Sequence, residues 1–143
     1  MEQRETWMPG TSKILKITAI VVVAVVLFAA VFVALTFPRT VVEFPVSFTI
    51  GIDREQRQIE IPWLHDKAQV EVAVTDGSSL WRASITNSSG DEVWSHSALQ
   101  GEQTTYTSGW ITMPSAAYNF TFSTIGAGSL DASIKIISKG GIW

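Results

Sequence analysis

Cysteine is absent from the 143 residues of the chain. This absence excludes a disulfide framework, a zinc site built on thiolates, an iron–sulfur cluster held by cysteine and a cysteine nucleophile. A basic stripe is missing as well, since 10 lysine and arginine residues face 13 aspartate and glutamate residues, for a net charge of −3. Proteins that bind nucleic acid neutralise phosphates with clustered basic side chains, so we expect no nucleic-acid partner.

Charge is also missing from a long apolar stretch near the start of the chain. The 21 residues from Ile17 to Phe37 carry no charged side chain. As an α-helix this run would be roughly 31 Å long, about the thickness of the hydrocarbon core of a bilayer. Pro38 is expected to end the helix. The pattern predicts a transmembrane helix over residues 13–37, after a short N-terminal segment of residues 1–12.

A secretory signal peptide is the alternative interpretation of this stretch. The apolar region of a signal peptide is usually about 7–15 residues long and ends at small residues. Ala29, Ala30 and Ala34 resemble such a cleavage region, but the apolar run is longer than that. We therefore favour a retained membrane anchor.

The flanking charges predict the orientation of the anchor. Lys13 and Lys16 lie before the apolar stretch, and Arg39 follows it. The slight excess of positive charge on the N-terminal side favours a cytoplasmic N-terminus. The remainder of the chain would then be an extracytoplasmic, periplasmic domain of a single-pass protein of the inner (cell) membrane.

No His, Asp, Glu, Lys or Arg lies within the uncharged run, which excludes a proton relay, an ion path or a histidine-held pigment inside the bilayer. Ala24, Ala30 and Ala34 provide a small-residue surface for packing against another helix. The other interpretation is a plain lipid-facing anchor with alanines at these positions.

After Pro38 the sequence alternates between apolar and polar residues with period two. Val70, Val72 and Val74 fall on one face of their segment, and Tyr118, Phe120 and Phe122 on one face of theirs. Trp81, Ala83 and Ile85, and Ile134 with Ile136, repeat the pattern, which is typical of antiparallel strands with one buried face. The expected strands are 40–52, 58–62, 69–75, 80–86, 92–97, 106–113, 117–124 and 132–138.

Seven or eight short antiparallel strands separated by turn residues predict an all-β sandwich over residues 38–143, with an immunoglobulin- or GOLD-like build. The segments VEVAVTDGSSLWRASITNSSGDEVWSHS and YNFTFSTIG resemble GOLD-type sandwich domains over about residues 68–137. In those proteins the sandwich precedes the membrane helix, whereas here it follows. The resemblance implies an architecture and no function.

The connection between helix and sandwich is short. Only Arg39 stands between Pro38 and the first expected strand, with no Gly/Ser tether or Pro-rich stalk. The sandwich is therefore expected to lie close to the bilayer surface.

Candidate chemistry in the domain is sparse. His65 stands beside Asp66 in an expected loop, and His96 is expected to point outward from a strand. No spacing supplies the further ligands of a zinc site, and no nucleophile elbow accompanies the histidines. We expect no bound metal, no cofactor and no catalysis.

Tryptophan, present six times, supplies the interface candidates. Trp7 and Trp63 are expected near membrane interfaces. For Trp94 and Trp110 two interpretations stay open: core packing, or an outward platform for sugar rings or a partner protein. The terminal pair Ile142 and Trp143 would either fold back on the sandwich or dock into a neighbour.

These observations together favour a non-catalytic accessory subunit that braces a larger membrane complex, with photosynthetic and respiratory assemblies as candidate hosts. Its partners would be integral membrane subunits and lipid. The alternative is a membrane-anchored binding module for a glycan, a lipid or a soluble protein. A third hypothesis is an assembly factor that binds only transiently.

Overall fold

The computed structural model describes residues 8–49, 51–77, 80–98, 105–126, 129–141 and 143. Side chains are described for these residues except 8–11, 51–53, 125 and 126. The chain divides into two compact units, Met1–Leu35 and Thr36–Trp143, each described here by itself.

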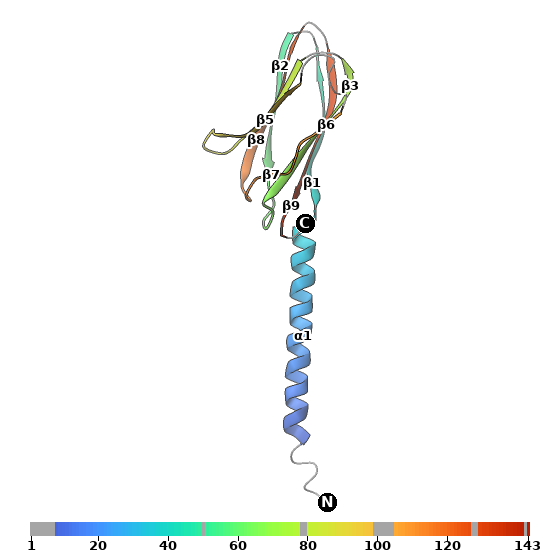
Figure 1. Ribbon diagram of the computed structural model, residues 1–143, viewed down its shortest axis with the longest axis vertical. Helices are drawn as coiled ribbons and strands as arrows, with labels where there is room; N and C mark the ends of the chain where they lie inside the picture. Colours follow the sequence, from blue (N-terminus) through green and yellow to red (C-terminus); the bar gives the residue numbers. More distant parts are fainter. Residues whose placement is uncertain (1–7, 50, 78–79, 99–104, 127–128, 142) are drawn as a thin grey trace, which may run out of the picture. The chain divides into compact units, whose positions relative to one another are not determined.

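The described residues of the first unit form one helix, α1, which spans Met8–Thr36 (Figure 1). The part Ser12–Thr36, 25 residues, is long and apolar enough to cross a membrane, a property that membrane anchors and signal sequences share. The described side chains from Ser12 to Ala34 are all exposed to solvent. The described part of the helix therefore has an apolar surface on every side.

The second unit is a β-sandwich of two antiparallel sheets, shown in Figure 1. Its described strands are β1 (Arg39–Phe48), β2 (Gly51–Glu60), β3 (Lys67–Gly77), β4 (Leu80–Thr86), β5 (Glu92–Ala98), β6 (Thr105–Thr107), β7 (Ile111–Thr112), β8 (Ala117–Gly126) and β9 (Leu130–Lys139). One sheet has the order β1-β9-β3-β6, with β7 also paired to β3, and the other has the order β2-β8-β4-β5.

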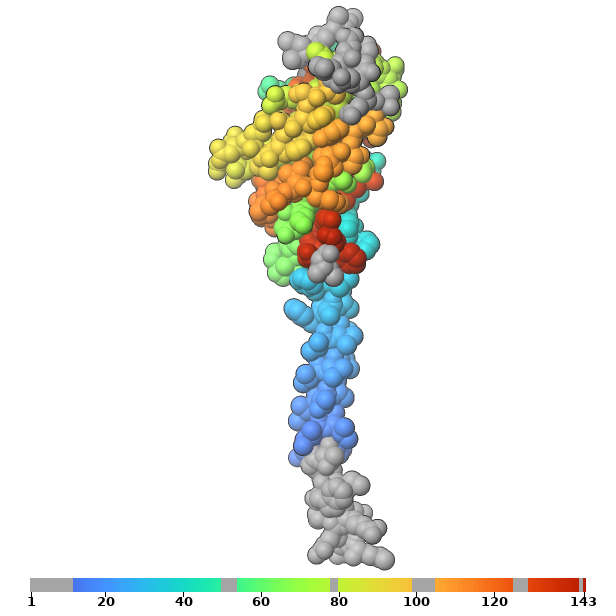
Figure 2. Space-filling view, in the orientation of Figure 1, coloured from blue at the N-terminus to red at the C-terminus, as the bar shows by residue number. Residues whose placement is uncertain are grey.

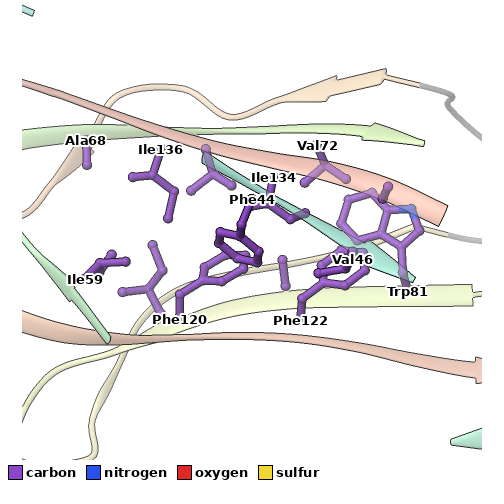
Figure 3. Close-up of a cluster of buried hydrophobic side chains, with 14 of the residues drawn as sticks. Phe44, Val46, Ile59, Ala68, Val72, Trp81, Phe120, Phe122, Ile134 and Ile136 are labelled. Atoms are coloured by element: carbon purple, nitrogen blue, oxygen red, sulfur yellow. The ribbon is translucent and has the colours of Figure 1, made fainter. Parts of the chain in front are cut away.

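The core lies between the two sheets and is built by the period-two alternation of the sequence. In Figure 3, Phe44, Val72 and Ile134 point from the β1-β9-β3 sheet toward Phe120 and Phe122 of β8. The Phe44 and Phe120 rings meet edge to face with their centroids 6.0 Å apart, a preferred aromatic geometry. Such contacts remove the apolar face of each sheet from water, which is the main driving force for folding.

The predicted inward faces are confirmed. The side chains expected to point inward are buried on β4, β8 and β9, and on β3 Val70 and Val72 are fully buried while Val74 is half-buried. The sandwich predicted from the pattern is therefore the fold, preceded by one apolar helix.

Three expected strands differ from the structure. Segment 58–62 is no separate strand, because β2 runs from Gly51 to Glu60 and residues 61–62 lie outside it. Segment 40–52 was expected to be continuous, but β1 ends at Phe48 and β2 begins at Gly51. Segment 106–113 is interrupted between β6 and β7, where Ser108 hydrogen bonds to the backbone of Val70 through both its N–H and its hydroxyl group. These two hydrogen bonds hold the chain to β3 in the interval between β6 and β7.

Candidate functional site

The sandwich begins and ends at one place. Thr36 is 1% exposed, its carbonyl oxygen accepts a hydrogen bond from the N–H of Gly140, and its hydroxyl oxygen accepts one from Nε1 of Trp143 at 3.2 Å. The rings of Phe37 and Trp143 meet edge to face at 5.2 Å. Figure 2 shows the red carboxyl-terminal segment beside the cyan start of β1. We call this region the Thr36 end of the sandwich.

The turn between β2 and β3 belongs to the same end. The N–H of His65 donates to the carbonyl oxygen of Pro62, which closes a turn in which Leu64 has φ of 68°. A Cβ on Gly140 would lie 1.8 Å from the carbonyl oxygen of Leu64, so only glycine allows the tail to approach this turn. Leu64 occupies a left-handed conformation usually left to Gly or Asn, and Trp63 precedes it.

His65 is a structural residue of this end. It is 2% exposed, and its Nδ1 lies 2.6 Å from the hydroxyl oxygen of Ser138 on β9. The N–H of Asp66 donates to the carbonyl oxygen of Lys139, which continues the attachment of the turn to β9. The expected loop position of His65 is confirmed, and the side chain points into the fold.

Four aromatic side chains remain exposed around the Thr36 end. Trp63 is 72% exposed, Phe37 55%, Trp110 40% and Trp143 39%. The ammonium nitrogen of Lys139 lies 4.0 Å from the centre of the Trp110 ring, a cation–π contact. Trp110 was expected in a strand, but it lies in the interruption between β6 and β7, so its ring is not held in the core.

A second cluster of aromatic side chains joins β5 of one sheet to β6 of the other. The His96 and Tyr106 rings are stacked with centroids 3.7 Å apart, and both contact Trp81. Trp94 stacks on Tyr106 at 6.4 Å and is half-buried against the core. His96 was expected to point outward; that expectation is wrong, because the ring is half-buried in this cluster.

A polar groove of about 170 Å³ lies on the outer face of the β1-β9-β3-β6 sheet. It is lined by Glu43, Glu71, Val72, Ala73, Thr105, Thr107, Ser133 and Lys135. Lys135 pairs in register with Glu43 on one side and with Glu71 on the other, so a basic residue stands in a row between two acidic ones. None of the described residues that line the groove is aromatic.

The remaining predicted site residues are distributed as follows. Ala24, Ala30 and Ala34 are exposed on α1, and a shallow apolar groove on the helix includes Ala24. Trp7 and Ile142 lie outside the described residues. Within the described part of the chain, no group of three or more His, Asp or Glu side chains is arranged to hold a metal ion.

Sequence reasoning missed Phe37, Lys139 and the whole polar groove. Phe37 was taken as the last residue of the membrane run, and its contact with Trp143 joins residues far apart in sequence. The groove arises from the order β1-β9-β3, which no local pattern encodes.

Comparisons with known proteins give no family. No known protein family matches the chain, and no curated protein matches it in sequence. Among solved structures, the chain is similar to PirA, with a TM-score of 0.49 and 13% identity over 64% of this chain and 90% of that one.

Two further structural likenesses are weaker. The first is to PliG of Aeromonas hydrophila, a periplasmic inhibitor of g-type lysozyme, with a TM-score of 0.45 and 9% identity over 68% of this chain and 85% of PliG. The second is to the carbohydrate-binding module TmCBM61 in complex with β-1,4-galactotriose, with a TM-score of 0.45 and 11% identity over 75% of this chain and 90% of that one. These likenesses concern the β-sandwich architecture and assign no ligand.

Proposed function

We propose that this chain is a non-catalytic, single-pass accessory subunit that braces a larger membrane complex from the periplasmic side of the inner membrane. The observation that carries the proposal is α1. Its 25-residue apolar part has every described side chain from Ser12 to Ala34 exposed. Such a surface needs lipid or other apolar helices to cover it.

The junction between helix and sandwich limits where a signal sequence could be removed, since cleavage after Ala34 would leave the sandwich whole whereas cleavage further on would not. Thr36 is the last residue of α1 and also the buried first residue of the sandwich. Only Phe37 and Pro38 separate it from β1. Cleavage beyond Thr36 would therefore remove a residue to which Gly140 and Trp143 are hydrogen-bonded.

The described polar groups of the sandwich support a role in contacting other proteins rather than a role in catalysis. Among the described side chains, no buried nitrogen or oxygen lacks a hydrogen-bond partner. His65 is engaged with Ser138, and His96 is stacked between aromatic rings. These side chains fulfil structural roles, and the surface remains as the functional part of the domain.

The test is purification of the chain from its native membrane in a mild detergent, followed by identification and quantification of the chains that accompany it. We expect integral membrane proteins in stoichiometric amounts. Substoichiometric recovery would indicate a transient assembly factor. Recovery as a lone monomer would refute the subunit role, and a soluble form trimmed after Ala34 would refute the anchor.

The polar groove favours a second candidate, a membrane-anchored binding module. Alternating carboxylate, ammonium and hydroxyl groups along Glu43, Lys135, Glu71 and Thr107 match the donors and acceptors of a polyhydroxylated ligand such as a glycan. The full chain in detergent would be titrated with a panel of soluble oligosaccharides.

Binding at the groove should be weakened by Glu71→Gln. The control is Glu92→Gln, since Glu92 lies on β5 of the other sheet in an exposed ion pair with Arg82. Binding that both variants retain would place the ligand elsewhere, and no binding by the unmodified chain would exclude soluble glycans of the panel.

A further inference from the structure

We infer that the Thr36 end of the sandwich docks onto the lipid headgroup layer through its exposed aromatic side chains. The inference rests on the anchoring role proposed for α1 and adds a second membrane contact, made by the domain itself. The occupant is lipid, and the four side chains that make the contact are Phe37, Trp63, Trp110 and Trp143.

Covalent geometry fixes the depth of two of these rings. Phe37 directly follows the last residue of α1, and consecutive Cα atoms are about 3.8 Å apart. The Trp143 ring lies 5.2 Å from the Phe37 ring. When the apolar run of α1 crosses the hydrocarbon core, both rings are therefore at the level where the core meets the headgroups, whatever the tilt of the domain.

Backbone contacts hold Trp63 at the same end of the sandwich. The carbonyl oxygen of Leu64 packs against Gly140, and Gly140 donates its N–H to Thr36. Trp63 therefore belongs to a turn that touches a residue bound to the end of the helix. Trp63 is 72% exposed. Leu64, which follows it, has a left-handed backbone conformation, and folds retain such a conformation when the surrounding contacts enforce it.

The chemistry of this end is that of a membrane interface. Tryptophan is enriched where bilayer and water meet, because its ring is amphipathic, and lysine reaches the headgroups while its methylene stem lies on apolar surface. The ammonium nitrogen of Lys139 lies over the Trp110 ring, so a cationic group stands beside one of the exposed aromatic side chains. Lys67 and Asp66 offset one another, whereas Arg39 and Lys139 add positive charge to this end. On vesicles of zwitterionic phosphatidylcholine, aromatic burial rather than net charge is expected to dominate the contact.

The test uses the full chain reconstituted into phosphatidylcholine vesicles with and without lipids brominated just below the headgroup. The signal of Trp63 is the difference between the emission of the unmodified chain and that of Trp63→Phe. We expect this difference emission to be blue-shifted and lost in brominated vesicles, with no recovery at high salt. The matched control is Trp94→Phe, whose difference emission should be unchanged by bromine because Trp94 packs on Tyr106 at the sandwich edge.

Flotation of the vesicles separates the two proposals. A chain that floats while Trp63 emits as in water and escapes quenching would overturn the docking and leave the anchor standing. A chain that does not float would overturn both. Protection of Trp63 in the native complex but not in vesicles would show that protein, not lipid, covers this end, and would also overturn the inference.

Discussion

The backbone N–H of Gly140 donates a hydrogen bond to the carbonyl oxygen of Thr36, with 3.0 Å between nitrogen and oxygen. The last residues of the sandwich are thereby attached to its first residue, and to the turn at Leu64. This relationship is the basis of the first prediction.

Gly140→Ala should destabilise the sandwich. The added Cβ would lie 1.8 Å from the carbonyl oxygen of Leu64, so the backbone must move, and overpacking of this kind costs about 1–3 kcal/mol of unfolding free energy. Chemical denaturation of the full chain in detergent measures the change. The control is Gly109→Ala, where nothing lies within 4 Å of the added Cβ, and a cost at Gly109 equal to that at Gly140 would contradict the packing argument.

Val72→Asp should prevent folding of the sandwich. Val72 is fully buried between the sheets, and a carboxylate there would have no charged partner in the core. The loss should exceed about 4 kcal/mol, a large share of the stability of a domain. Circular dichroism and limited proteolysis report the outcome. Ala73→Asp, on the outer face, is the control, and a folded Val72→Asp variant would disprove the strand phase.

Ser138→Ala should cost about 1–3 kcal/mol, because the buried His65 ring loses the hydroxyl group 2.6 Å from its Nδ1. The measurement is again the free energy of unfolding, compared with Ser133→Ala on the same strand. Ser133 faces the polar groove instead of the core, so its loss should be close to neutral. Equal effects at the two serines would show that the His65 contact contributes nothing.

Lys135→Glu should destabilise the sandwich through the row that Lys135 forms with Glu43 and Glu71. Opposite charges across neighbouring strands contribute roughly 0.2–1 kcal/mol each, and like charges reverse the sign. We expect a loss of about 1 kcal/mol at low salt that shrinks at high salt, since the row is partly solvated. Lys135→Gln should show a smaller loss, and a salt-independent effect would contradict the electrostatic cause.

Alkaline pH should destabilise the sandwich in part through Tyr118. Burial raises the pKa of the Tyr118 hydroxyl group above its ordinary value of 10.0, and the hydroxyl group donates a hydrogen bond to the carbonyl oxygen of Pro114. The contribution of this group is fully present below pH 10 and decreases as pH rises from there through the raised pKa of the folded state, because the unfolded chain ionises first. Unfolding measured from pH 8 to pH 11 should show a smaller alkaline loss for Tyr118→Phe than for the unmodified chain. Parallel curves would remove Tyr118 as a cause.

The sequence pattern predicted the faces of the strands better than their limits. Where alternation is regular, as on β8 and β9, the predicted inward residues are the buried ones. The register of β4 and β5 pairs Ile85 with Trp94 and Thr86 with Glu92, which leaves Val93 without a partner. This bulge makes both Val93 and Trp94 half-buried, so alternation alone assigned His96 to the wrong face.

The Thr36 end and the polar groove depend on contacts between distant residues. Thr36 and Trp143 are 107 positions apart, and Lys135 meets Glu43 only because β9 pairs with β1. Local propensity carries no information about such pairings, since register and strand order are decided by how whole faces are buried. The exposure of Trp63 likewise results from the geometry of the turn, so it could not be predicted from the residue type alone.

The central position of β9 has a consequence for how the protein is made. β9 is the last of the described strands along the chain, yet it lies between β1 and β3 and pairs with both along nearly their full lengths. Until β9 is available, β1 lacks its described partner in that sheet, and β1 and β3 each leave a hydrogen-bonding edge unpaired. The sheet therefore cannot be completed before β9 is available, and until then the unpaired edges of β1 and β3 are the part of the domain that is prone to pair with other chains.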